Sequence, residues 1–243
     1  MALSVNELIN RVAVEVGLRP ASDPWASEQQ HFEQMRNLLQ LAGEELAHLH
    51  PWEFAVREHQ ITTSDSDSGD YPLPADFLYM LNQTGWERSE NVPLFGPLSA
   101  QDWTYLLGRD LVSYTIYATF RLKQNQFSIF PQPPPNGLDI NFEYQSSAWV
   151  DTNGDGEADS GELEDGDDVV LYDKTLITRY LKLKWLEAKG FDTTKPQADF
   201  NQIFDSIAGR DKAAEILSAG RNSRLFPYLD ARYNAPDTGY GVL

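Results

Sequence analysis

The sequence predicts an α+β fold, with helical N-terminal and C-terminal parts around a central antiparallel β meander and an extended C-terminal arm. Apolar residues recur at helical spacing near both ends of the 243-residue chain, and three β-rich runs lie between them. The last 24 residues, 220–243, show no period at all. We expect one unit with five segments: N-terminal helices in 1–50, a β-rich middle in 51–150, an acidic insertion in 151–168, C-terminal helices in 169–219 and the arm in 220–243.

The first predicted helix starts at a capping box. Ser4 can accept a hydrogen bond from the N–H of Glu7, whose side chain can reach back to the N–H of Ser4. Gly17 suits the position just after the helix end, where a positive φ is favoured. The apolar positions between them are Val5, Leu8, Ile9, Val12 and Val16.

A second predicted helix runs from about Ser27 to His48 and is stopped by Pro51. Its apolar residues step by three and four, which gives one continuous stripe for packing in a core or against another subunit. The stripe consists of Phe32, Met35, Leu39, Ala42, Leu46 and Leu49.

The middle of the chain changes to β character. Residues 71–74 (YPLP) must be extended, because each proline fixes its own φ and restricts the residue before it. Three β-rich runs follow at 112–122, 126–130 and 138–144, joined by short connections. Short connections between neighbouring runs predict an antiparallel meander. In the first run one face is apolar, with Tyr114, Ile116, Ala118 and Phe120.

Two further helices are predicted near the C-terminus. The first begins near Asp173 and ends at Lys189 and Gly190, a cation followed by a glycine. The second spans about Pro196 to Ala219 and has Gly209 in its interior. Its apolar stripe comprises Phe200, Ile203, Phe204, Ile207, Ala214 and Leu217.

The arm is rich in aromatic and large apolar residues, which disordered segments lack. They are Leu225, Phe226, Tyr228, Leu229, Tyr233 and Tyr240. We therefore expect an arm that docks on a partner, although a loose tail is the ordinary fate of a terminus.

Composition excludes several classes of protein. A net charge of −18 leaves no basic footprint for nucleic-acid binding. The absence of cysteine excludes disulfides and thiolate chemistry. The sequence has no secretion signal and no apolar run of about 18 residues, so we expect a protein made in a cytoplasm without membrane contact.

Residues 151–162 match the calcium-loop pattern D-x-[DN]-x-[DN]-G-x5-E without a gap. Oxygens at positions 1, 3 and 5 point inward around a hard cation, Gly156 permits the sharp turn, and the last glutamate closes the shell with two oxygens. The sequence therefore predicts a calcium site. Its expected ligands are the side chains of Asp151, Asn153, Asp155 and Glu162, the carbonyl of Glu157, and Asp159 through a water molecule.

The flanks of this loop do not form an EF-hand. No amphipathic helix follows it, and position 8 is Ala158, where a paired loop has a branched residue. We expect a single inserted loop that binds calcium weakly, on the order of 10⁻⁴–10⁻³ M, in a structural role. The alternative is an acidic solvated loop that matches the pattern by chance, since 151–168 hold nine acids and no base.

Other chemistry is sparse, and we expect no catalytic residues. The histidines are His31, His48, His50 and His59, and their spacing is too irregular for a metal pair, so surface or packing roles are expected. The sequence has no nucleophile elbow, P-loop or dinucleotide-binding motif.

An ordered series of short motifs runs through the middle of the chain. It comprises 71–77 (YPLPADF), 82–88 (NQTGWER) and 93–103 (PLFGPLSAQDW), followed by Phe142-Glu143-Tyr144, Trp149, Leu183-Lys184-Trp185 and Ala188-Lys189-Gly190. Over about residues 50–220 this series resembles the head-to-tail adaptor, or head-completion, proteins of short-tailed bacteriophages. The calcium loop departs from the family's usual pattern, so the resemblance gives it no role.

The resemblance implies a structural virion protein in the neck of the particle. Such adaptors form a ring, commonly of twelve copies, which binds the portal protein above and a tail protein below. Viral DNA passes through the ring without specific binding, and the C-terminal segment tends to dock on the portal. Two alternatives stay open: a calcium-dependent binding module, and a tail-associated cell-wall hydrolase that uses an acid pair.

Overall fold

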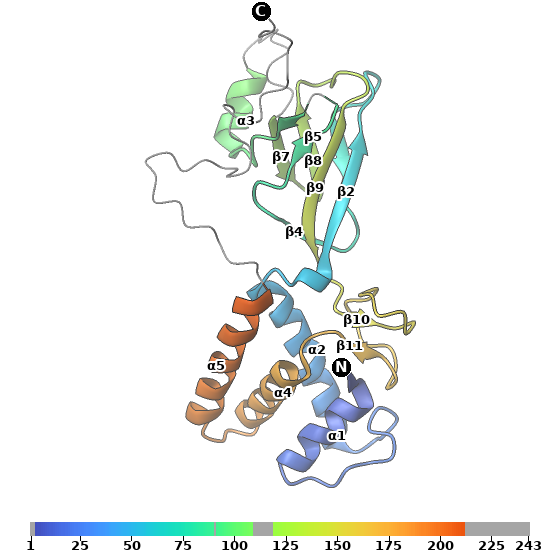
Figure 1. Cartoon of the computed structure of the whole chain (residues 1–243), viewed down its shortest axis with the longest axis vertical. Helices are drawn as coiled ribbons and strands as arrows, with labels where there is room; N and C mark the ends of the chain where they lie inside the picture. The colour runs from blue at the N-terminus through green and yellow to red at the C-terminus, as the bar shows by residue number, and fades with distance from the viewer. Residues whose placement is uncertain (1–2, 90, 109–118, 212–243) are drawn as a thin grey trace, which may run out of the picture. The chain divides into compact units, whose positions relative to one another are not determined.

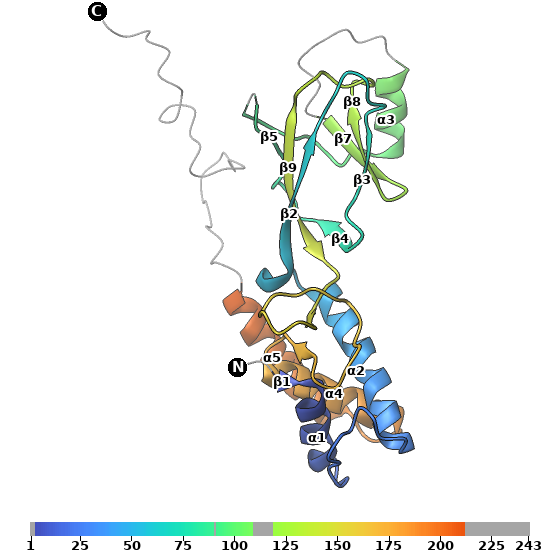
Figure 2. The ribbon, with the colours of Figure 1, turned by 90° about the vertical axis from the view of Figure 1, so that its right-hand side faces the viewer.

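Segments from both ends of the chain build a helical part (Figures 1 and 2). The computed structural model describes residues 3–89, 91–108 and 119–211, all within the compact unit Met1–Ala213. Helix α4 contacts α1, α2 and α5. The helices are α1 (Val5–Glu15), α2 (Gln30–Leu49), α4 (Lys174–Ala188) and α5 (Thr194–Asp211). A small antiparallel sheet lies in the same part and has the strand order β1-β11-β10. Its strands are β1 (Leu3–Ser4), β10 (Val150–Asp151) and β11 (Val169–Val170).

The predicted ends of α1 and α4 are confirmed. Ser4 Oγ accepts from the N–H of Glu7 at 3.3 Å, and Glu7 Oε2 accepts from the N–H of Ser4 at 3.4 Å. Asp173 caps α4 by accepting from the N–H groups of Thr175 and Leu176. Gly17 and Gly190 have φ values of +82° and +72°, as the position after a helix end favours.

The core of the helical part contains the predicted stripes. Trp149 and Tyr172 are fully buried against α2, and the Tyr172 hydroxyl donates to the carbonyl of Gly43 at 2.9 Å. Leu49 was expected in the α2 stripe, but that prediction is wrong because its side chain is 52% exposed. The buried stripe residues include Leu8, Ile9, Val12, Phe32, Met35, Leu39, Ala42, Leu46 and Phe200.

The β-rich middle contains two antiparallel sheets. The strands are β2 (Val56–Thr62), β3 (Asp70–Pro72), β4 (Phe77–Met80), β5 (Trp86–Glu87), β6 (Val92–Pro93), β7 (Thr119–Lys123), β8 (Gln126–Phe130) and β9 (Asp139–Ser146). One sheet has the order β2-β9-β5-β6, with β4 also paired to β9, and the other has the order β3-β8-β7. The 3₁₀ turn η1 (Glu53–Ala55) leads from the helices into β2.

The expected meander is correct for its first connection and wrong for its second. Strands β7 and β8 form a hairpin across Gln124 and Asn125, which both have positive φ. Strand β9 does not pair with β8, because the proline-rich connection 131–137 takes the chain to the other sheet. There β9 pairs with all seven residues of β2, a strand that was not among the predicted β runs.

The two sheets share an aromatic core. Phe127 is stacked between Phe120 and Phe142, with ring centroids 4.9 and 5.2 Å apart, so β7, β8 and β9 meet at these rings. The short helix α3 (Ala100–Leu107) was also not anticipated. Its signal was Ser99, which caps the helix by accepting from the N–H of Asp102 at 3.1 Å.

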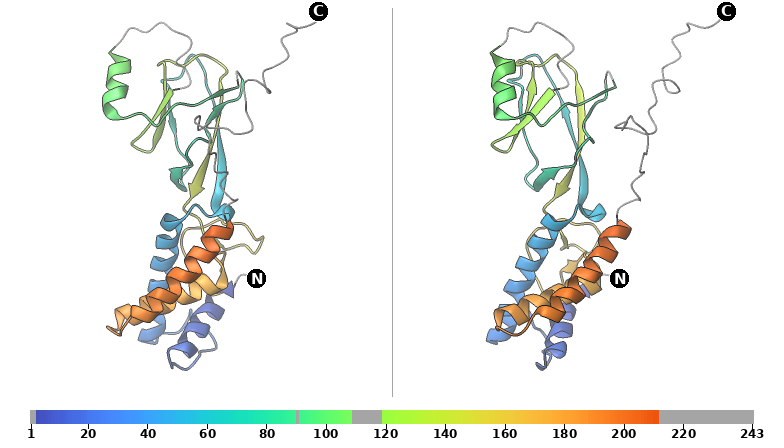
Figure 3. Two further views of the ribbon diagram at one scale, coloured as in Figure 1. Left: turned by 60° about the vertical axis from the view of Figure 1, so that its left-hand side comes forward. Right: turned by 90° about the vertical axis from the view of Figure 1, so that its left-hand side faces the viewer.

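The predicted α+β class is confirmed, with helices at both ends around antiparallel β structure (Figure 3). Some predictions fall outside the described residues: the start of the first β run, including Tyr114, Ile116 and Ala118, and everything predicted after Asp211, including the arm. Helix α5 runs through Gly209 as a single element.

Candidate functional site

The acidic segment, residues 151–168, leaves the small sheet at the end of β10 and returns to it at β11. Its first half folds back on β10, since the N–H groups of Asp159 and Ser160 donate to the carbonyl of Val150 at 2.9 and 3.1 Å. The segment is therefore an ordered element of the helical part.

A tight turn in the acidic segment is organised around Asp151. This carboxylate is only 3% exposed and accepts from the N–H groups of Gly154 and Gly156 at 2.6 and 2.8 Å. Gly154 and Gly156 have φ values of +80° and +89°, which glycine tolerates best. Asn153 and Asp155 each accept from the N–H two residues on, as the turn-forming side chains of such a loop do.

Four of the six predicted calcium ligands, Asp151, Asn153, Asp155 and Asp159, accept hydrogen bonds within the loop. Asp159 accepts from the N–H and the hydroxyl of Thr152 at 3.0 and 2.9 Å. Asp159 and Glu162 both line a hollow beside α2, which Glu44 also lines. Among the described residues, the histidine and acidic side chains form no group of three or more that could hold a metal ion. Metal binding by this loop stays a prediction.

The second half of the acidic segment is anchored to the start of α1. Asp168 is 5% exposed and accepts from the N–H groups of Glu164 and Asp165 at 2.7 and 2.8 Å. The N–H of Asn6 donates to the carbonyl of Gly166, and that of Val5 donates to the carbonyl of Asp168, both at 2.9 Å.

The centre of the segment is anchored to α2. Gln40 donates to the carbonyl of Gly161 at 2.9 Å and accepts from the N–H of Leu163 at 3.0 Å. The indole N–H of Trp149 donates to the same Gly161 carbonyl at 3.0 Å. Backbone groups, which carry no sequence signal, make most of these contacts, so Gln40 and Asn6 were not predictable from the sequence.

A third anchor comes from β2. Arg57 donates through Nη2 to the carbonyl of Ala158 and through Nη1 to Asp76 Oδ2 at 2.8 Å. Asp76 also accepts from Ser146 Oγ at 2.6 Å and from the Tyr144 hydroxyl at 3.1 Å. Burial alone would raise the pKa of Asp76, but these hydrogen bonds and the charge of Arg57 outweigh it and lower the pKa below its ordinary value.

The histidines have packing and surface positions, as predicted. His50 is 7% exposed and lies 4.7 Å from the Trp52 ring, while its Nε2 is 3.2 Å from Asp211 Oδ2. Asp211 also accepts from the N–H of Glu53 at 3.1 Å. The end of α5 is thereby fastened to the connection between α2 and β2.

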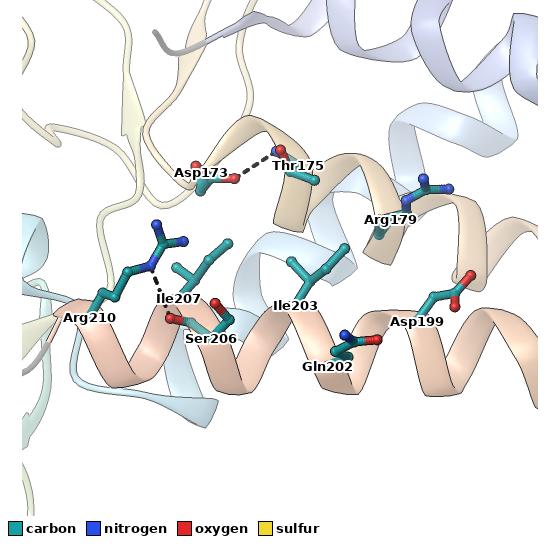
Figure 4. A pocket seen from close by; sticks show the side chains of 9 residues that line it. All are labelled: Asp173, Thr175, Arg179, Asp199, Gln202, Ile203, Ser206, Ile207 and Arg210. Carbon is teal, nitrogen blue, oxygen red and sulfur yellow. Dashed lines mark hydrogen bonds between the residues drawn. The ribbon is translucent and has the colours of Figure 1, made fainter.

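An open hollow of about 650 Å³ lies between the N-terminal half of α4 and α5 (Figure 4). Ile203 and Ile207 contribute apolar surface, and Asp173, Arg179, Asp199 and Arg210 contribute both signs of charge. Asp173 and Arg210 make hydrogen bonds within the elements that carry them.

Among the described residues, no helix is both long enough and apolar enough to cross a membrane. No curated protein matches the sequence significantly. The family model of the SU10 adaptor protein matches residues 3–225, which covers every described element. The resemblance to phage head-to-tail adaptors is thus confirmed, and the chain belongs to the SU10 adaptor protein family, a family of structural adaptor proteins of bacteriophages.

Proposed function

We propose that the protein is a head-to-tail adaptor that forms a ring between the portal and the tail of a short-tailed phage. The family match over residues 3–225 carries this proposal. Twelve copies is the expected number from the resemblance, and the particle neck is the expected location. The protein acts through its surfaces and performs no catalysis.

The charge of the chain supports passage of DNA through such a ring. A net charge of −18 repels a polyanion, so DNA can move along an acidic wall without being retained. The tail protein lies on the opposite side of the ring from the portal. The arm, residues 220–243, is proposed to dock on the portal, as its content of aromatic residues favours.

Electron microscopy and mass measurement of the purified protein, alone and with its portal, test the proposal. A ring of defined copy number on the portal is expected. A protein that stays monomeric and unbound with the portal present would contradict it. Removal of residues 220–243 should weaken portal binding, and unchanged binding would exclude the arm from the interface.

Calcium binding by the acidic segment is a second, separate proposal. Its support is the ordered spacing of Asp151, Asn153, Asp155, Glu157, Asp159 and Glu162, together with the positive φ of Gly156. Two of these residues, Asp159 and Glu162, line the same hollow beside α2. A bound calcium ion would neutralise part of a crowded negative segment and brace it.

Calcium titration of thermal stability and of proteolysis between Trp149 and Val169 tests this second proposal. Calcium should protect the native protein and fail to protect a Glu162→Gln variant. Glu164→Gln is the matched control, because position 164 lies outside the twelve-residue pattern. If the native protein shows the same thermal stability and the same proteolysis with calcium and with a chelator, the loop does not bind calcium.

The same preparations distinguish the two alternative functions. Partner binding that a chelator abolishes would favour a calcium-dependent binding module. Turnover of a cell-wall polymer that is lost on changing one specific acid would favour a hydrolase.

A further inference from the structure

The acidic segment is held at several points by different parts of the fold. Asn6 of α1 and Gln40 of α2 bind the carbonyls of Gly166 and Gly161. Arg57 of β2 binds the carbonyl of Ala158, which lies three residues before Gly161. Along the chain, the segment is thus bound first by a strand of the β sheet, at Ala158, and three residues later by a helix, at Gly161.

The guanidinium of Arg57 joins two acceptors that belong to different segments. Nη1 contacts Asp76, between β3 and β4, and Nη2 contacts Ala158 in the acidic segment. Asp76 is itself fixed by Ser146 and Tyr144, both on β9. A planar guanidinium can serve both acceptors at once, whereas a lysine ammonium lacks that fork.

The backbone itself connects the helices with the sheets through the described residues 53–55 and 147–149. Near the second connection, the N–H of Ser147 donates to the carbonyl of Asp76 at 2.8 Å. The Arg57–Ala158 contact adds a noncovalent connection beside it. Arg57 is 39% exposed, so this contact can open without unfolding either core.

We propose that the acidic segment is a strap between the helical part and the β sheets, and that Arg57 is its releasable latch. With the latch closed, the segment limits the movement of the β sheets against the helices. With the latch open, the backbone connections at residues 53–55 and 147–149 remain, and this restraint is lost. A subunit of an assembly can use such a latch to adjust to its neighbours. The latch requires neither calcium nor a ring.

Hydrogen exchange followed by mass spectrometry tests the latch. In Arg57→Ala, amides of residues 157–161 should exchange about tenfold faster than in the native protein, the factor expected for loss of one charge-assisted hydrogen bond. Arg57→Lys should show most of the same loss. Lys184→Ala, which removes an ion pair to Glu45 within the helical part, is the control and should leave these amides unchanged. Unchanged exchange in Arg57→Ala overturns the proposal.

A distance measurement tests the restraint independently. The chain has no cysteine, so spin labels at Glu33→Cys on α2 and Lys123→Cys on β7 report one distance. The distribution of distances between the two labels should be broader in Arg57→Ala than in the protein that keeps Arg57. If Arg57→Ala does not fold, Gln40→Ala releases the strap from α2 instead and should also broaden it. Equal widths in every folded variant overturn the strap.

Discussion

A Cβ atom built on Gly43 would lie 2.3 Å from Cζ2 of Trp149, so α2 and the residue before β10 touch without room for a side chain. Alanine favours a helix over glycine by about 1 kcal/mol. Overpacking against a fully buried indole costs about 1–3 kcal/mol, and so short a contact lies at the upper end. We expect Gly43→Ala to lower the free energy of unfolding by roughly 2 kcal/mol net, measured by denaturant titration.

Gly209→Ala is the matched control for this substitution. Gly209 lies in α5, and a Cβ there would meet no atom within 4 Å. The change should raise the free energy of unfolding by about 1 kcal/mol, since only helix propensity acts. Equal effects at both positions would mean that Trp149 does not restrict α2.

Gln145 on β9 is 1% exposed, and neither atom of its side-chain amide has a hydrogen-bond partner within the part of the chain that the structure describes. An unpaired buried polar group costs about 1–3 kcal/mol. Gln145→Met keeps the length of the side chain and should raise the free energy of unfolding by about 1 kcal/mol. The neighbouring Ser146→Ala loses a bond to Asp76 at 2.6 Å and should lower it. Destabilisation by Gln145→Met would indicate that an internal water satisfies the amide.

Asp76 should contribute to the loss of stability of the fold at low pH. Its folded-state pKa is lowered, so its contribution is fully present above the ordinary value near 4 and is lost as the pH falls through the folded value. Asp76→Asn should reduce stability at neutral pH and flatten the loss below about pH 4. Thermal unfolding between pH 2 and pH 7 measures both effects. If the variant loses stability below about pH 4 as steeply as the native protein does, Asp76 is not the source of that loss.

Salt should stabilise the acidic segment. It carries nine acids and no base, and screening of their repulsion favours the folded state. Raising sodium chloride from about 0.02 to 0.5 M should raise the Tm. The rise should be smaller in an Asp155→Asn, Glu157→Gln double variant, whose two side chains are exposed in the native protein. The same rise of Tm in both proteins would mean that Asp155 and Glu157 do not contribute to the repulsion.

Local patterns predicted the helices well. Ser4 with Glu7, and the glycines at 17 and 190, act within a turn of the chain, so their neighbours in sequence contain the information. Apolar spacing likewise predicted the buried faces of α1 and α2, because a helix repeats regardless of what it packs against.

The failures have a common physical origin in distant pairing. Whether β9 pairs with β8 or with β2 depends on the packing of residues far apart in the sequence, and short connections alone cannot decide it. The pairs His50–Asp211 and Arg57–Ala158 join residues 161 and 101 positions apart. In the candidate site the turn at Gly156 was predictable, whereas its anchors on α1, α2 and β2 were not.

The helical part is interrupted in sequence by the whole of the β-rich middle, from β2 to β9. A ribosome therefore releases every strand of both larger sheets before it makes α4, against which α1, α2 and α5 pack. The apolar faces of α1 and α2 that pack against α4 therefore stay uncovered while more than a hundred residues are synthesised. The order of synthesis thus favours sheets that mature first and a helical core that closes last, when α4 arrives.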